Sequence, residues 1–205
     1  MSTKARFLIL AVLVVLVAAI PVGLLAFGGD GGREDDFRGS LPPAGIELPE
    51  LALADMDGNV VRTEDLRGKV ALVTFLDTQC EESCPLIAAA IADGLGRLSA
   101  EERGRVVAVA LSVDPAEDTP ESVRRFLARQ DAEEALRYLV APVGEMRPLW
   151  EAFGVAASAD TGMDDLHSAP LRIYDSSGVW AATLNAGADL TPQNLVHDVR
   201  VALDS

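Results

Sequence analysis

The sequence predicts an α/β fold in which a mixed β-sheet is flanked by helices. Two nearly continuous apolar runs, residues 70–77 and 105–114, are typical of strands that are covered on both faces. Segments with helical spacing of apolar residues alternate with these runs, and this order predicts parallel strands with helices on both sides. A strand–turn–strand pattern at residues 170–187 adds antiparallel strands, so the sheet is expected to be mixed.

The first elements of the domain are a hairpin, a buried strand and a helix. Alternating apolar positions on either side of Asp57-Gly58 predict a hairpin within residues 46–69, because Asp-Gly is a common turn pair. The first buried strand follows directly. Residues 85–98 are rich in alanine and have apolar residues at helical spacing, and Pro85 suits the first turn of that helix.

The alternation of strands and helices continues after the second buried strand. The sequence "DTPES" opens a helix in which Thr119 is the expected N-cap and Pro120 the first helical residue. A start at Asp118 is the alternative. Residues 135–141 are expected to form a third strand.

The remaining segments predict a short helix, a closing hairpin and a last helix. Residues 144–155 form a short helix that turns Trp150 and Phe153 inward. The closing hairpin turns at "DSSG", residues 175–178. The last helix, residues 191–203, carries apolar residues along one face and completes the fold.

The amino-terminal segment predicts a membrane anchor. Residues 7–28 carry no charge and are almost all apolar, and about 20 such residues span a bilayer core. Basic residues within residues 1–6 place that end in the cytosol by the positive-inside rule. We therefore expect a single-pass protein of the cell membrane, with a flexible linker at residues 29–45 and one extracytoplasmic domain at residues 46–205. A signal peptide is the alternative for residues 7–28.

The net charge of −15 narrows the choice of partners. Such an acidic chain is not expected to bind nucleic acid or anionic lipid headgroups. It is compatible with a basic protein partner or with the attraction of cations. Simple solubility is the alternative explanation of the charge.

The only two cysteines of the chain, Cys80 and Cys84, lie between the first buried strand and the following helix. Functional groups gather at such carboxyl ends of strands. Pro85 disfavours helical geometry at Cys84, so an irregular loop is expected. Glu81 and Glu82 oppose ionisation and the loop holds no Lys or Arg, so a strongly activated nucleophile is not expected.

Three kinds of chemistry remain open for the cysteine pair. An inert disulfide would close a loop of about five residues and add only ~2 kcal/mol. A redox pair would open and close the disulfide. Two thiolates also hold a soft cation such as Cu(I). The last two are favoured, because a domain of this size gains little from so short a loop.

The two histidines have different expected roles. His197 lies in the closing helix and is expected at the surface. His167 lies in a loop just before a predicted strand, and a strand beside the first buried strand would bring that loop to the cysteines. Imidazole, like thiolate, is a suitable ligand for copper, so His167 is a candidate third ligand. Met163 in the same loop is a weaker candidate for a thioether ligand.

Four stretches of the chain resemble a known family: "LADMDGNVVRTEDLRGKVALVTF", "CEESCP", "LSVDPAEDTPESVRRF" and "HSAPLRIYDSSG". They are similar to the SCO/SenC proteins, membrane-anchored copper chaperones of cytochrome c oxidase assembly. The resemblance covers residues 45–204. It implies a thioredoxin-like fold, with the amino-terminal hairpin as an insertion.

The resemblance also implies a site and a partner. Cys80, Cys84 and His167 would bind copper, as Cu(I) with Cu(II) left open, and deliver it to the CuA site of cytochrome c oxidase subunit II. Such a carrier is not an enzyme. The alternative is a thiol–disulfide oxidoreductase that keeps the CuA-site cysteines of the partner reduced. Another copper chaperone or a thiol reductase is a further expected partner.

Overall fold

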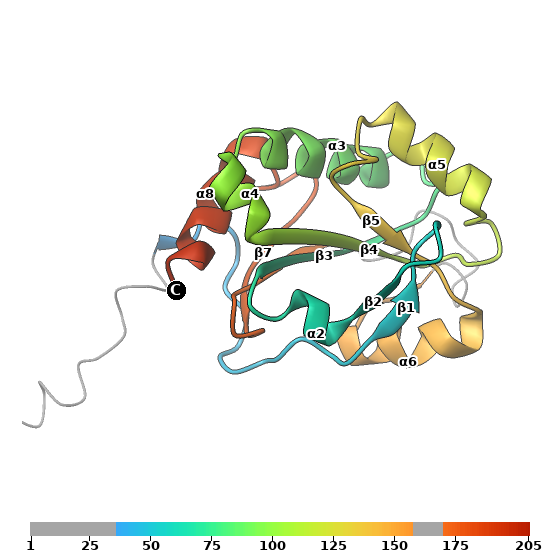
Figure 1. Cartoon of the computed structure of the whole chain (residues 1–205), viewed down its shortest axis with the longest axis horizontal. Helices are drawn as coiled ribbons and strands as arrows, with labels where there is room; N and C mark the ends of the chain where they lie inside the picture. The colour runs from blue at the N-terminus through green and yellow to red at the C-terminus, as the bar shows by residue number, and fades with distance from the viewer. Residues whose placement is uncertain (1–35, 158–169) are drawn as a thin grey trace, which may run out of the picture. The chain divides into compact units, whose positions relative to one another are not determined.

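A five-stranded mixed sheet forms the centre of the domain (Figure 1). The structure, a computed structural model, describes residues 36–157 and 170–205. The strand order is β5-β4-β3-β6-β7, with bounds β3 Val70–Leu76, β4 Val106–Ser112, β5 Arg137–Leu139, β6 Leu171–Tyr174 and β7 Trp180–Leu184. Strands β3, β4 and β5 are parallel, whereas β6 is antiparallel to β3 and β7 to β6. The predicted mixed sheet is confirmed.

Helices cover both faces of the sheet, as predicted (Figure 1). One face packs against α3 (Ser83–Gly96), α5 (Pro120–Arg129) and α8 (Pro192–Leu203). The other face packs against α6 (Val143–Phe153), α2 (Thr63–Leu66) and a hairpin of β1 (Ala52–Ala54) and β2 (Val60–Arg62). All seven residues of β3 are buried, because alternate side chains enter the two cores.

Threonine–proline pairs start two of the helices. The Thr119 side chain accepts a hydrogen bond from the backbone N–H of Ser122, and Pro120 begins α5. The same arrangement recurs at α8, where Thr191 is the N-cap. Thr119 is therefore the N-cap as predicted, and the alternative start at Asp118 is wrong, because that side chain points into the domain.

Two features of the chain differ from the expected elements. The short helix α4 (Ala100–Gly104) was not predicted, because five residues are too few to show a helical period. The structured domain also begins before residue 46, since Ser40 pairs with Thr183 of β7 and Asp198 of α8 accepts hydrogen bonds from the backbone N–H groups of Arg38 and Gly39. The predicted anchor, residues 7–28, lies outside the described residues. Within the described residues, no helix is long and apolar enough to cross a membrane.

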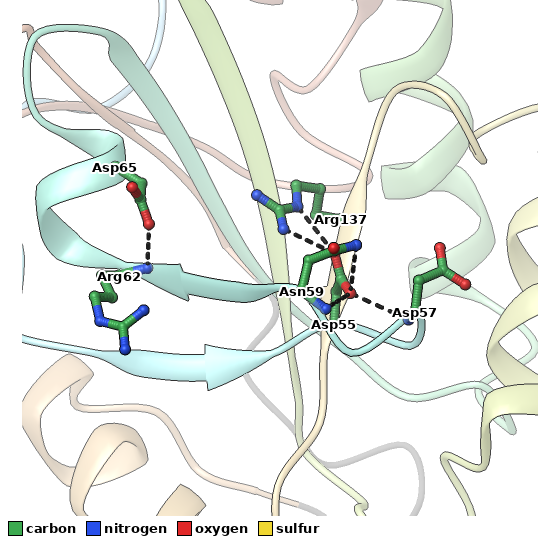
Figure 2. A network of polar contacts seen from close by, with 6 residues as sticks. All are labelled: Asp55, Asp57, Asn59, Arg62, Asp65 and Arg137. Carbon is green, nitrogen blue, oxygen red and sulfur yellow. Dashed lines mark hydrogen bonds and ion pairs between the residues drawn. The ribbon is translucent and has the colours of Figure 1, made fainter.

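The hairpin is fastened to the edge strand β5 through Asp55 (Figure 2). Oδ1 of Asp55 accepts hydrogen bonds from the backbone N–H groups of Asp57 and Asn59, at 3.1 and 2.8 Å. Oδ2 accepts from Arg137 on β5 at 2.8 Å. Gly58 has a φ of 82°, a conformation that glycine adopts without strain. One carboxylate therefore closes the turn and joins the hairpin to the sheet.

The pKa of Asp55 reflects this position. Burial acts to raise the pKa, but the hydrogen bonds from Arg137 and from the backbone of Asn59 and Asp57 outweigh it, so the pKa is lowered. A lowered folded-state pKa means that the ionised carboxylate stabilises the fold. This contribution is complete above the unfolded-state pKa of about 3.9 and is lost as the pH falls through the folded-state value.

Replacing Asp55 with asparagine is expected to lower the free energy of unfolding by about 1–2 kcal/mol at pH 7, the range for a charged hydrogen bond with one partly exposed partner. The difference from wild type should shrink below about pH 4. Urea unfolding at pH 7 and pH 3 measures it. Asp57→Asn is the matched control, because the Asp57–Arg124 ion pair is exposed and contributes little. An Asp55→Asn effect that is equal at both pH values would contradict this role.

Candidate metal and redox site

The cysteine pair lies at the carboxyl end of β3, at its junction with α3. Both residues carry thiols rather than a disulfide. Cys80 is 6% exposed and Cys84 is 0% exposed, and both belong to the core beneath α3. The position at the carboxyl end of a buried strand was predicted from the sequence and is confirmed.

The prediction of irregular geometry at Cys84 was wrong. Helix α3 begins at Ser83, so Cys84 is helical although Pro85 follows it. The Cys80 sulfur accepts a hydrogen bond from the backbone N–H of Cys84 at 3.4 Å and lies 3.6 Å from the Ser83 hydroxyl. Proline is tolerated in a first turn, where its missing N–H would have no partner within the helix. The sulfur of Cys80 thus satisfies a donor at the helix start.

The two thiols have different surroundings. The hydrogen bond with Cys80 and burial raise the pKa of the Cys84 thiol far above its usual range. A hydrogen bond with the backbone of Asp77 acts in the opposite direction and does not offset them. The neutral thiol form of Cys84 is therefore favoured in the metal-free protein, and Cys84 agrees with the expectation of no strongly activated nucleophile.

A buried carboxylate holds the cysteine loop to the sheet. Asp118 accepts a hydrogen bond from the backbone N–H of Thr78 at 2.9 Å. It also accepts from the hydroxyl of Ser112 on β4 at 2.6 Å and from that of Tyr138 on β5 at 2.8 Å. Burial raises the pKa of Asp118, and these hydrogen bonds oppose the increase without cancelling it. Asp118 therefore connects the loop to two neighbouring strands.

A surface pocket of about 310 Å³ reaches Cys80. Cys84 is not among its lining residues. Helix α5 contributes Ser122, Arg125 and Arg129 to the lining, and the cysteine loop contributes Glu81. A molecule that enters this pocket therefore lies beside Cys80, Arg125 and Arg129.

The strand register places β6 beside β3, the strand that leads to the cysteines. Val73 of β3 lies opposite Arg172, and Ala71 lies opposite Tyr174. Because these strands are antiparallel, the amino end of β6 lies beside the carboxyl end of β3. The predicted neighbourhood of the two strands is confirmed. His167 itself lies in residues 158–169, outside the described residues, as does Met163.

The second histidine, His197, lies on α8 and does not line the pocket at Cys80. Nδ1 of His197 on α8 is 3.0 Å from Oδ1 of Asp198, and its side chain is partly exposed. Within residues 36–157 and 170–205, no three His, Cys, Asp or Glu side chains are arranged to hold a metal ion. The described part of the site therefore provides the two thiols.

Comparison with known proteins assigns the family. The model of the SCO1/SenC family matches residues 44–204, most of the chain. This chain belongs to the SCO1/SenC family. The SCO1 protein homolog of Bacillus subtilis is 35% identical over 86 residues, which are 42% of this chain and 44% of the relative. The chain thus matches less than half the length of the first curated relatives.

Solved structures of Sco proteins share the fold. ScoI of Bradyrhizobium japonicum with copper bound is 26% identical, covers 78% of this chain and 100% of its own, and has a TM-score of 0.65. BsSco is a member of the Sco family of cytochrome c oxidase assembly proteins and has a disulfide switch. It is 23% identical to this chain. The match covers 80% of this chain and 96% of BsSco, with a TM-score of 0.65. The expected thioredoxin-like α/β fold is confirmed.

Sequence reasoning missed three residues around Cys80. Arg125 and Arg129 belong to α5 and were not linked to the cysteines, because the cysteine loop itself has no basic residue. Asp118 was considered only as a helix start. Its place in the connection that follows the second buried strand was an available signal, because adjacent parallel strands bring their carboxyl ends to the same edge of the sheet.

Proposed function

We propose that this chain is a copper metallochaperone that binds Cu(I) through Cys80, Cys84 and His167. Two adjacent thiols at the end of β3 carry the proposal, because soft sulfur ligands select Cu(I). The antiparallel pairing of β6 with β3 supports the third ligand, since the amino end of β6, which follows His167 in the sequence, lies beside the carboxyl end of β3. The copper-bound ScoI of Bradyrhizobium japonicum, a member of the same family, supports the choice of metal.

The proposed acceptor is the CuA site of cytochrome c oxidase subunit II. Family membership, and the place of BsSco among the cytochrome c oxidase assembly proteins, support an oxidase as the target. Another copper chaperone or a thiol reductase would load or reduce the site. Residues 7–28 would anchor the chain in the cell membrane with the domain on the extracytoplasmic side. The intact mass of membrane-extracted protein tests the anchor, and loss of about 30 residues would contradict it.

Copper must displace the proton of Cys84 when it binds. Because the pKa of Cys84 is raised, the thiol form competes with the metal at neutral pH. Metal binding to such a thiol releases protons, so the affinity for Cu(I) should increase as the pH rises. The site would then combine two thiolates and one neutral imidazole around a monovalent cation.

A titration of the reduced full chain with Cu(I), against a competing chelator and without oxygen, tests the ligand set. Wild type should bind one Cu(I) per chain. His167→Ala should weaken binding at least about tenfold, because even residues that only orient a ligand contribute 10–100-fold.

His197→Ala is the matched control, since His197 is paired with Asp198 on α8. It should bind like wild type. Equal affinities of wild type and His167→Ala would remove His167 from the site. Failure of wild type to bind Cu(I) would remove the chaperone function.

The asymmetry of the two thiols favours a second candidate, a thiol–disulfide oxidoreductase. Cys80, which lines the pocket, would attack the disulfide of a partner and release one partner thiolate. Cys84 would then lose its proton, attack the Cys80 sulfur and release the second thiolate, leaving the pair oxidised. This reaction needs no histidine, so a His167→Ala chain that reduces the CuA-site cysteines as fast as wild type would support it.

A further inference from the structure

The pocket beside Cys80 carries basic charge on a strongly acidic chain. The sequence has 17 basic and 32 acidic residues, with a net charge of −15. The pocket is lined by Arg125 and Arg129 but by only one acidic residue, Glu81. The two arginines are four positions apart on α5, so their side chains lie on the same face of the helix. This local excess of positive charge differs from the rest of the chain.

Both arginines are available to a ligand. Arg125 forms an ion pair with Glu121, but the two side chains are 59% and 84% exposed, and such pairs contribute little. The side chain of Arg129 forms no ion pair or hydrogen bond with another residue that the structure describes. Guanidinium groups bind carboxylates with two parallel hydrogen bonds. The pocket thus offers a carboxylate site next to a cysteine.

We propose that this pocket recognises small thiols and disulfides that carry carboxylates, and presents them to Cys80. The volume of about 310 Å³ is near the lower end of the range for small-molecule sites, about 300–1,000 Å³, and therefore suits a compound of low molecular weight. The inference deepens the proposed function, because the pair must be reduced before it binds copper. Small thiols and disulfides of this class would set the redox state of Cys80 and Cys84.

The exchange is a thiol–disulfide reaction at Cys80. The Cys80 thiolate attacks one sulfur of an anionic disulfide R–S–S–R, a mixed disulfide Cys80–S–S–R forms, and R–S⁻ leaves. Cys84 then gives its proton to solvent and attacks the Cys80 sulfur, and the second R–S⁻ leaves. In the reverse direction, two anionic thiols reduce the oxidised pair and become R–S–S–R. The arginines hold the carboxylates of R in both directions.

The test uses the full chain with Cys84→Ser, metal-free, so that the reaction stops at the mixed disulfide. Cys80 reacts with 5,5′-dithiobis(2-nitrobenzoate), which carries two carboxylates, and with uncharged 4,4′-dithiodipyridine. The ratio of the two rate constants measures preference for the anion and cancels differences in the reactivity of Cys80. Adding Arg125→Gln and Arg129→Gln together should lower this ratio about fivefold, and either change alone about twofold, as for exposed charge interactions.

Arg124→Gln on the same helix is the matched control, because it removes the same charge but Arg124 does not line the pocket and pairs with Asp57. The ratio of rate constants for this variant should equal that of the Cys84→Ser chain with all its arginines. The ratio should also fall with added salt. A ratio unchanged in the double variant, an equal fall with Arg124→Gln, or no reaction of Cys80 with either reagent would overturn the proposal. Copper affinity is measured separately with both cysteines present, so failure of the chaperone function would be distinct.

Discussion

In the folded, reduced chain, Cys80 is expected to react with an uncharged disulfide reagent at least about a hundredfold faster than Cys84. Cys80 borders a pocket that solvent enters, whereas Cys84 is 0% exposed and has a raised pKa. A thiol reacts as its thiolate and only where the reagent has access. Cys84 must wait for local opening, and each ~1.4 kcal/mol of opening free energy slows the reaction about tenfold.

Single-cysteine chains measure this difference. Cys84→Ser leaves only Cys80, and Cys80→Ser leaves only Cys84, so the rate with excess 4,4′-dithiodipyridine belongs to one sulfur in each variant. In Cys80→Ser the hydrogen bond with the Cys80 sulfur is absent, but burial still raises the pKa of Cys84. In guanidinium chloride the two variants should react at equal rates, which controls for intrinsic thiol chemistry. Equal rates in the folded state would contradict the assignment of Cys80 as the entry point.

This asymmetry determines the order of events at the site. Of the two cysteines only Cys80 lines the pocket, so an incoming metal, thiol or disulfide is expected to contact Cys80 before Cys84. Cys84 joins in a second step that requires its proton to leave. Both candidate functions use the same order, so the measurement bears on copper transfer and on disulfide exchange.

Asp118→Ala is expected to lower the free energy of unfolding by at least ~3 kcal/mol. The change leaves the backbone N–H of Thr78 and the hydroxyls of Ser112 and Tyr138 without their acceptor in the protein interior. A buried polar group left unpaired costs about 1–3 kcal/mol. Urea unfolding followed by tryptophan fluorescence measures the loss. The cysteine loop should also become more open, because Thr78 lies two residues before Cys80.

Two further variants isolate the role of the carboxylate. Asp118→Asn should cost much less than Asp118→Ala, because its amide oxygen still accepts from Thr78 and its amide N–H groups can donate to the two hydroxyls. Asp114→Ala is the matched control in the same connection, where the side chain makes one exposed hydrogen bond to the backbone N–H of Ala116. A loss with Asp114→Ala as large as with Asp118→Ala would contradict the proposed role of Asp118.

Local patterns predicted most of the fold. The apolar runs that became β3 and β4 show burial on both faces directly, because such strands have no solvent-facing residues. The Thr-Pro pairs mark the starts of α5 and α8, since the cap and the fixed φ of proline act within one helical turn. The Asp-Gly and "DSSG" turns likewise depend on adjacent residues. The spacing of Cys80 and Cys84 and their place after a strand identified the candidate site.

Contacts between distant segments were decided by the tertiary structure. Arg129 lies 49 positions after Cys80 in the sequence and reaches its pocket because α5 packs on the same face of the sheet as α3. Asp118 meets the cysteine loop because β3 and β4 are adjacent and parallel. The sequence by itself determined the strands, the helix starts and the two thiols, because these depend on sterics and apolar periodicity over a few residues. Only the packed sheet determined which cysteine borders the pocket and which charged residues line it, because burial depends on all the elements that meet there.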